Sequence, residues 1–390
     1  MTLHTVVFLQ NKKSQAGVLQ AFTEGLQEAF NRLGVTTASY DFEAFESGKC
    51  ISEIAARNAD CTIGFNILLP EDSPLSQLKI PHYAPLCDSA TYYPELRLSN
   101  HMLASFMEQD SYGFLKRLGV ENIFFLPHAI SGALLSQKVH KRDLDVVMAG
   151  SFINPEAICK VWDEQLSAKS VQAMLDIAER VLASSQLSHL QAFTELVEEH
   201  GDFEKELLSK KLDFYSQLNM LEVYIRNTDR LRIVQNIENY TVHIFCSSAF
   251  QLNWQKALKG QKNIQFHDEV SFKDLGTIFS RAKAIINSIP TIKRGLHERL
   301  LLALASGASV LGNENVFITS QLQAPKALLN ILSPNYKNAN AMLDETFDNE
   351  EARLADVFST HKIIKEHHTW DVRAKTLMTT LPPFLRRLNQ

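Results

Sequence analysis

The segment that decides the fold of this chain spans residues 263–315 and reads NIQFHDEVSFKDLGTIFSRAKAIINSIPTIKRGLHERLLLALASGASVLGNEN. Short apolar runs in it predict buried strands, and stretches with helical spacing lie between them. The predicted strands and helices alternate in the order 264–267, 272–280, 284–288, 297–306 and 308–311. This alternation is typical of βαβ units that build a parallel sheet. The sequence therefore predicts an α/β fold.

The start of the helix after residue 296 has the composition of an anion site. His297, Glu298 and Arg299 stand where the first free backbone N–H groups point outward, and all that follows is apolar. Free N–H groups and the positive end of the helix dipole attract phosphate. Gly295 lets the backbone come close to a ligand, and Gly307 predicts a left-handed stop. The alternative is a capped core helix, as in any α/β protein.

These residues resemble the donor-binding half of the GT-B glycosyltransferases. Within that class they are most similar to the bacterial spore-maturation-type, family 1-like enzymes, whose helix carries Arg and an A-x-G-A stop. The resemblance covers the segment 263–315 well and extends more loosely from about residue 141 to the C-terminus. It implies two Rossmann-like domains that face a cleft, with the nucleotide on the second domain and the acceptor on the first.

The rest of the chain is compatible with that division. Residues 1–140 alternate strands and helices and are expected to form an N-terminal Rossmann-like acceptor domain. Residues 141–365 are expected to bind the nucleotide sugar, with a helical insertion at 153–240 that packs, covers the cleft or carries a surface for a partner or a second copy. Residues 366–390 resemble the closing helix that returns to the first domain.

Composition and charge limit the classes of function expected of this chain. A chain of 390 residues with 45% hydrophobic and 21% charged residues is an ordinary globular protein of two domains. Its net charge of −5 and lack of a basic run argue against nucleic-acid binding. No apolar run reaches the ~18 residues that span a bilayer. Five scattered cysteines indicate a reducing cytoplasm. The first predicted strand lacks a following G-x-G-x-x-G, so no cofactor is expected beyond the nucleotide-sugar substrate.

Cations and strand ends supply the candidate donor site. Lys293 and Arg294 precede the helix and could balance the charge of a diphosphate, or could be a solvated loop pair. Ser247, Asn313 and Asn315 follow predicted strands, where α/β sheets bind ligands, although a turn serine is the plainer interpretation of Ser247. The full predicted donor-binding set is Lys293, Arg294, Gly295, His297, Glu298, Arg299, Val270, Ser247, Asn313 and Asn315.

At Leu302 the chain departs from a pattern of the GT-B enzymes. At Asp143–Asp145 it matches another pattern in spelling only. Many GT-B relatives have a glutamate for the donor ribose where this helix has Leu302. Glu298 lies one helical turn earlier, about 6 Å along the axis, and could substitute. The D-x-D at Asp143–Asp145 matches metal-dependent transferases only in spelling, because it opens a predicted strand. No metal site is expected.

An inverting transfer would need a base for the acceptor hydroxyl. Asp88 and His82, in a polar segment of the first domain, are candidates, as is His128 before the second domain. A helix cap for Asp88 and a structural position for either histidine are the alternatives, and a retaining enzyme would need no such base.

The sequence thus predicts a cytoplasmic glycosyltransferase that moves a hexosyl or related group, without a metal, from a nucleotide sugar. The expected acceptor is a glycan such as a bacterial surface glycan, a lipid-linked precursor or a protein. A nucleotide-sugar 2-epimerase and a non-catalytic GT-B-like binding subunit are the alternatives. Leu302 favours the last of these.

Overall fold

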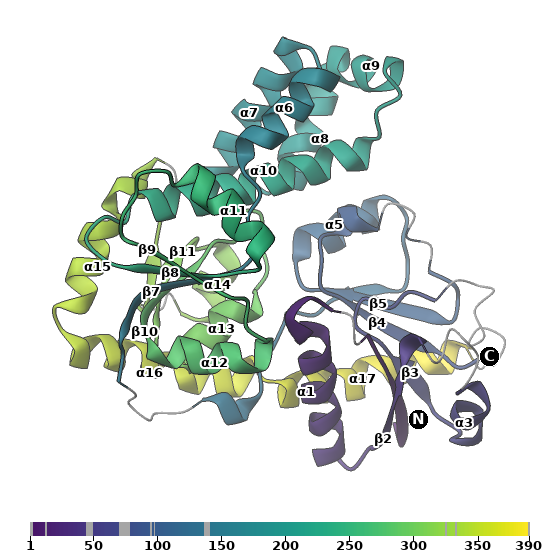
Figure 1. Cartoon of the computed structure of the whole chain (residues 1–390). Helices are drawn as coiled ribbons and strands as arrows, with labels where there is room; N and C mark the ends of the chain where they lie inside the picture. Colours follow the sequence, from purple (N-terminus) through teal and green to yellow (C-terminus); the bar gives the residue numbers. More distant parts are fainter. Residues whose placement is uncertain are drawn as a thin grey trace. The chain divides into compact units, whose positions relative to one another are not determined.

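The computed structural model describes residues 3–11, 14–43, 50–69, 79–93, 96, 98–135, 141–323, 326–331 and 334–388. Its contacts divide the chain into two compact units (Figure 1). The N-terminal unit comprises Met1–Leu135, Ser271–Asp274 and Lys362–Gln390, and the C-terminal unit comprises Ser136–Val270 and Leu275–His361. Each unit holds a parallel sheet of six described strands, so the predicted α/β class is confirmed.

The sheet of the N-terminal unit has the strand order β2-β1-β3-β4-β5-β6. Its strands are β1 (Thr5–Gln10), β2 (Thr36–Asp41), β3 (Cys61–Ile63), β4 (His82–Leu86), β5 (Met102–Phe106) and β6 (Ile123–Phe125). Its helical elements are η1 (Gln15–Gly17), α1 (Val18–Arg32), α3 (Ile51–Ala56), η2 (Ala90–Tyr92), α5 (Gln109–Arg117), η3 (Gly132–Leu134) and α17 (Trp370–Leu388).

The core of the N-terminal unit forms where α1 and α17 lie side by side on the sheet (Figure 1). Phe22 and Phe30 on α1 bury their rings against Phe8 of β1 and Trp370 of α17. A Cβ at Gly25 would collide with the Trp370 indole, so a glycine is what allows the two helices this approach. The last helix of the chain is therefore part of the first unit's core.

The sheet of the C-terminal unit has the order β12-β11-β10-β7-β8-β9. Its strands are β7 (Leu144–Ala149), β8 (Val242–Phe245), β9 (Ile264–His267), β10 (Ala282–Asn287), β11 (Ser309–Gly312) and β12 (Leu328–Asn330). Helices α11 (Ser248–Ala257), α12 (Phe272–Arg281), α13 (Glu298–Ala305), α14 (Val316–Gln321), η4 (Asn335–Asn338), α15 (Ala339–Phe347) and α16 (Glu350–His367) follow or connect them. Phe152 stacks on Trp254, with ring centroids 3.8 Å apart, in the core on one face of this sheet.

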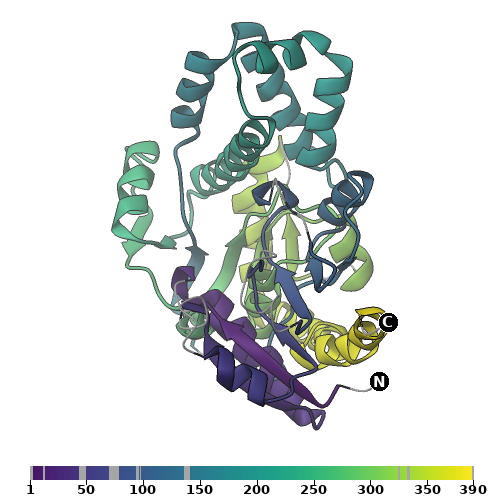
Figure 2. The same cartoon turned by 90° about the vertical axis from the view of Figure 1, so that its right-hand side faces the viewer.

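The chain between β7 and β8 is a cluster of helices (Figures 1 and 2). They are α6 (Pro155–Gln165), α7 (Ala168–Leu182), α8 (His189–Glu199), α9 (Gly201–Ser209) and α10 (Phe214–Gln235). Side chains at Asn154, Ser167, Ser188 and Asp213 accept hydrogen bonds from backbone N–H groups at helix starts. These caps explain where the helices begin, since each satisfies a donor that lacks a partner within its helix.

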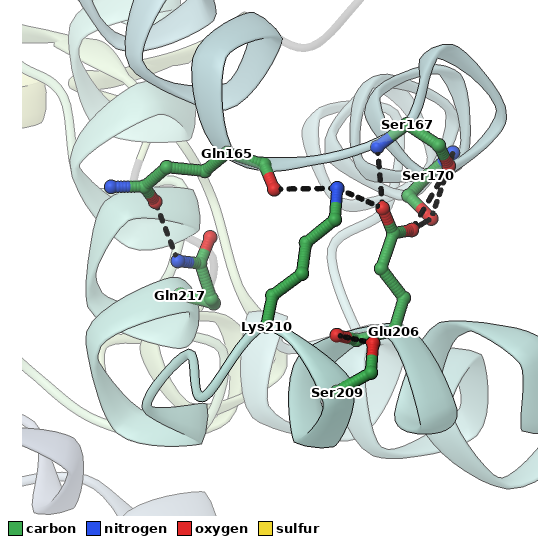
Figure 3. A network of polar contacts seen from close by, with 7 residues as sticks. All are labelled: Gln165, Ser167, Ser170, Glu206, Ser209, Lys210 and Gln217. Carbon is green, nitrogen blue, oxygen red and sulfur yellow. Dashed lines mark hydrogen bonds and ion pairs between the residues drawn. The ribbon is translucent and has the colours of Figure 1, made fainter.

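A polar network ties this cluster together (Figure 3). The Glu206 carboxylate of α9 accepts hydrogen bonds from Ser167 N at 2.7 Å and from Ser170 Oγ at 2.5 Å, at the start of α7. Lys210 Nζ bridges Glu206 and the Gln165 carbonyl at the end of α6. The lysine and these donors hold the pKa of Glu206 at about 2 against the opposing effect of burial, so the carboxylate stays charged.

Membrane-spanning helices and clusters of metal ligands are both absent from the described residues. No helix there is long and apolar enough to cross a membrane. No three or more His, Cys, Asp or Glu side chains are gathered there in a way that could hold a metal ion.

Candidate functional site

The candidate site lies at the carboxyl edge of the C-terminal unit's sheet. All its strands are parallel, so the segments that follow β7, β8, β9, β10 and β11 emerge at one edge. The helix predicted to bind phosphate, α13, begins at this edge between β10 and β11. Its predicted stop is confirmed, because Gly307 has φ +82° directly after the helix.

His297 caps the start of α13. Its Nδ1 lies 3.2 Å from the Arg299 backbone N and 3.2 Å from Glu298 Oε2, and its Nε2 lies 3.3 Å from Arg299 Nη2. A neutral imidazole has one donor and one acceptor nitrogen, so it cannot accept from Arg299 at both ends at once. In the tautomer that caps α13 through Nδ1, Nε2 carries the proton; in the other tautomer, Nδ1–H faces Glu298 Oε2 and Nε2 accepts from Arg299 Nη2.

Two arginines enclose the turn that leaves β7. Arg299 Nη1 donates to the Ala149 carbonyl at 2.8 Å, and Arg230 Nη1, from α10, donates to the Ser151 carbonyl at 2.6 Å. Between them Gly150 has φ +149°, and a Cβ there would lie 3.2 Å from Arg299 Nη1. The glycine thus lets the guanidinium lie against the backbone, and both side chains are fixed by carbonyls.

A third arginine adds to the charge. Arg226, one turn before Arg230 on α10, is half-buried, and its contact with Glu222 is a long 3.8 Å. Its Nε is buried and lacks a hydrogen-bond partner among the described residues. Burial lowers the pKa of Arg230, and the charges of Arg226 and Arg299 lower it further. A multiply charged anion stabilises a group of cations that otherwise repel one another around a backbone turn.

Neither Arg230 nor Arg299 forms an ion pair with a carboxylate among the described residues, since their recorded partners are carbonyls and His297. Asp229 and Glu222 still act on Arg230 at longer range, and both favour its charged form. Arg226, Arg230 and Arg299 are called the arginine cluster below.

The structure places the predicted Lys293 and Arg294 against the helical cluster. Lys293 is only 1% exposed, and its Nζ donates to the carbonyls of Val181 at 3.0 Å and Ser184 at 2.7 Å, at the end of α7. Arg294 Nη1 donates to the Gln186 carbonyl at 3.4 Å. A buried ammonium at a helix C-terminus satisfies free carbonyls and the helix dipole. The geometry therefore favours an anchoring position for both side chains.

The two predicted asparagines shape the same edge. Asn313 accepts from Ile289 N at 2.7 Å and donates to Asp229 Oδ1 at 3.2 Å. Asn315 caps α14, and its Nδ2 donates to the carbonyls of Ile292 at 2.8 Å and Gly295 at 3.2 Å. Both therefore hold the loop that leads to α13.

The remaining predicted donor residues lie after β8 and β9 or at the start of α13. Ser247 follows β8 and stands before α11, where its side chain makes no capping hydrogen bond. Val270 is half-buried in the turn after β9. Glu298 is 5% exposed beside His297, and Leu302 is 1% exposed with Gly276 beside it. Leu302 is therefore a core residue of α13.

The three candidate bases lie in the N-terminal unit in unlike settings. His82 is buried in β4, where Nε2 donates to the Ile67 carbonyl at 2.9 Å and Nδ1 accepts from Thr62 Oγ1 at 2.8 Å. Burial lowers its pKa to about 4, and both nitrogens are engaged, so this geometry does not favour a base. His128 is 7% exposed and packs its ring on Phe22 with centroids 5.1 Å apart.

Asp88 is exposed at the carboxyl end of β4. Its Oδ2 accepts a hydrogen bond from Asn66 Nδ2 at 2.8 Å and lies 3.5 Å from the Tyr93 hydroxyl. Of the three candidates it is the one with a carboxylate at a sheet edge that can bind ligands.

Sequence reasoning missed Arg226 and Arg230, because they lie inside the helical pattern assigned to the insertion. Both are charged residues in a helix whose neighbouring residues are buried, and Arg230 itself is only 3% exposed.

The position of Asp143–Asp145 agrees with the interpretation that these residues open a strand. Arg281 forms two hydrogen bonds to Asp143, at 2.9 and 2.7 Å, and Lys283 pairs with Asp145 at 2.8 Å, at the opposite end of β7 from the site.

Comparison with known proteins agrees with this geometry. Residues 226–379 match a sequence family described as glycosyl transferase-like. No curated protein sequence matches the chain.

Several solved structures share its fold. A DNA-modifying β-glucosyltransferase, studied with and without UDP-glucose, is 12% identical, with 98% of this chain and 99% of that chain covered and a TM-score of 0.51. The T4 phage β-glucosyltransferase with UDP and Mn²⁺ is 11% identical, with coverage of 98% and 99% and a TM-score of 0.54. Anabaena HepE with UDP and glucose is 9% identical, with coverage of 97% and 100% and a TM-score of 0.53.

The fold is therefore that of the GT-B class, as the sequence predicts. The family match, which begins at Arg226 and includes α13, makes residues 226–379 similar to glycosyl transferases.

Proposed function

We propose that the arginine cluster binds the diphosphate of a nucleotide-sugar donor and stabilises the leaving nucleoside diphosphate. The observation that carries this proposal is that Arg230 and Arg299 hold the turn after β7 and that Arg226 lies close enough to act electrostatically on both. Guanidinium groups bind phosphate oxygens with two parallel hydrogen bonds, and fixed cations stabilise charge that develops in the transition state.

We assign supporting roles to the other predicted residues at this edge of the sheet. The free N–H groups at the start of α13 and, in the tautomer that caps the helix, His297 Nε2–H add donors for the phosphates or the sugar. Ser247 follows β8 and Val270 follows β9, the last strand on that side of the sheet, where a nucleoside could lie. Gly295, Asn313 and Asn315 set the loop, and Lys293 and Arg294 fix it to α7. Glu298 is the carboxylate nearest the position that relatives use for the ribose.

Three cations can offset a diphosphate's charge without a metal, and we propose a metal-independent transfer. The T4 phage β-glucosyltransferase, which shares this fold, has been solved in complex with UDP and Mn²⁺. Metal independence therefore needs a direct test. We expect turnover to persist in excess EDTA. Loss of turnover with EDTA and its return with Mn²⁺ would contradict metal independence and leave the donor site intact.

Asp88 is our proposed base for the acceptor hydroxyl. A carboxylate can take the proton while the hydroxyl oxygen attacks the anomeric carbon and the nucleoside diphosphate leaves. We propose a glycan, lipid-linked or protein acceptor and a cytoplasmic site of action, where nucleotide sugars would be supplied.

The test is donor turnover by the full chain. We would incubate it with UDP-, GDP- and dTDP-sugars and CMP-linked sugars and measure release of the free nucleotide. We expect release from one nucleotide class, and loss of release in Asp88→Asn with donor affinity unchanged. Tight binding with no release under any condition would support the alternative, a non-catalytic binding subunit, for which the buried Leu302 is the supporting observation.

A further inference from the structure

Asp88 belongs to a polar cluster built at the ends of two neighbouring strands. β3 and β4 are paired in parallel, so Asn66, three residues after β3, and Asp88, two residues after β4, lie at the same edge of the sheet. Tyr93, just beyond η2, closes the group. These three residues, Asn66, Asp88 and Tyr93, are called the carboxylate clamp below.

Asn66 holds the clamp from both sides. Its Oδ1 accepts from the Cys87 backbone N at 2.7 Å and from the Tyr93 hydroxyl at 3.1 Å. A backbone N–H is always a donor, so the amide atom that faces Cys87 must be the oxygen. The orientation of the amide follows, and Nδ2 must donate to Asp88 Oδ2, at 2.8 Å.

The backbone of Asn66 is shaped for this contact. Its φ is +54°, a left-handed conformation that asparagine tolerates better than most side chains, and its N–H donates to the Pro85 carbonyl at 2.9 Å. Asn66 thus bonds the segment on both sides of β4's end, at Pro85 and Cys87. The carboxylate that the Asn66 amide contacts belongs to Asp88, the residue after Cys87.

The Tyr93 hydroxyl is the second hydrogen-bond donor of the carboxylate clamp. Burial raises the pKa of its hydroxyl, and the neighbouring Asp88 and Cys87 raise it further, so the hydroxyl stays protonated in any ordinary assay. It donates to Asn66 and lies 3.5 Å from Asp88 Oδ2. Asp88 and Cys87 are the titratable neighbours that act on the Tyr93 hydroxyl.

We infer that Asn66 is a positioning residue for the transfer reaction, which fixes the Asp88 carboxylate in its ionised form and in one orientation. The inference rests on the proposed function of Asp88 as base. A donor whose hydrogen bond is stronger to the carboxylate than to the neutral acid favours ionisation. The Asp88 carboxylate should therefore accept a proton from the acceptor while one of its oxygens stays bound to Asn66.

Asn66→Gly tests this inference, because glycine removes the amide and keeps the left-handed backbone. Asn58→Gly is the matched control, since Asn58 is exposed in the same unit and has φ +49°. We would measure the titration midpoint of Asp88 by carboxyl ¹³C NMR, assigned with Asp88→Asn, and the pH profile of donor hydrolysis.

We expect Asn66→Gly to move the Asp88 midpoint and the acid limb of the profile to higher pH by about one unit. We expect kcat to fall about tenfold with the KM for the donor unchanged, and Asn58→Gly to match the wild type. Should Asn66→Gly fail to fold, Tyr93→Phe provides a second test, with a smaller shift in the same direction.

An Asp88 midpoint equal to that of the wild type in these variants would overturn the inference while leaving Asp88 as base. Full donor turnover by Asp88→Asn would overturn both, so the two failures can be told apart.

Discussion

At the scale of single residues, the arginine cluster is the main support for the donor site that we propose at this edge of the sheet. Arg230 and Arg299 are held by carbonyls of the turn after β7, and carboxylates offset the cost of their burial only in part, Asp229 and Glu222 for Arg230 and Glu298 for Arg299. Burying an uncompensated charge is unfavourable unless an anion arrives. The cluster is therefore less stable empty than occupied, and ligand binding should stabilise the fold.

Arg226→Ala tests the cluster, because Arg226 is half-buried and its loss leaves a small hole. We expect the dissociation constant for the preferred nucleoside diphosphate to rise roughly tenfold or more, as expected for a lost charge-assisted hydrogen bond. Arg232→Ala is the control, since Arg232 lies on the same helix, with a side chain 33% exposed against 31% for Arg226, but pairs with Glu179. Calorimetric titration measures both. Equal affinities in the two variants would remove Arg226 from the site.

His82 gives a second residue-scale prediction. Its folded pKa of about 4 lies below the ordinary 6.5, so its neutral form contributes stability that is complete above about pH 6.5 and is lost as the pH falls towards 4. The contribution is about 3 kcal/mol of unfolding free energy. His82→Gln should flatten the fall of stability between these pH values, measured by urea unfolding. Parallel pH profiles for variant and wild type would contradict a buried, neutral His82.

At the scale of elements, α10 joins the helical cluster to the nucleotide site. Asp229, between Arg226 and Arg230 in sequence, is fully buried and accepts hydrogen bonds from Ser288 Oγ at 2.6 Å and the Tyr336 hydroxyl at 2.8 Å. These bonds fix α10 to the segments after β10 and β12, and so place both arginines. Lys293 forms a second joint, at the end of α7.

Lys293→Met tests that second joint. The change leaves two carbonyls at the end of α7 without their buried donor, so we expect unfolding free energy to fall by about 2–3 kcal/mol. Lys283→Met is the control, because Lys283 pairs with Asp145 at a side chain 37% exposed and should cost under about 1 kcal/mol. Chemical denaturation measures both. If Lys293→Met instead keeps its stability and loses nucleotide affinity, the side chain belongs to the donor site.

Local elements could be predicted from the sequence where their patterns are short-range. The strand predicted at 264–267 is observed there, the helix predicted at 272–280 ends at Arg281, and the stop at Gly307 is as expected. Long-range partners could not be predicted. The position of Lys293 depends on α7, more than 100 residues earlier in the chain, and no spacing in the sequence shows which face of α10 carries Arg226 to the sheet.

At the scale of the whole molecule, the net charge predicts that this chain does not act on DNA. A related fold belongs to a DNA-modifying enzyme, but this chain carries a net charge of −5. We expect no binding to a labelled DNA duplex by fluorescence anisotropy at about 0.15 M salt, since nucleic-acid affinity depends on neutralising phosphates. Binding that weakens steeply with added salt would contradict this and make DNA a candidate acceptor.

The central claim is that the arginine cluster recognises a diphosphate. Calorimetric titration of the full chain with UDP, GDP, CDP and dTDP, each beside its monophosphate and nucleoside, tests it most directly. The account predicts that one diphosphate binds in the presence of EDTA, that its monophosphate binds at least about tenfold more weakly, and that added salt weakens the diphosphate more. Equal affinity for the nucleoside and its diphosphate, or no binding of any of them at millimolar concentration, would contradict it.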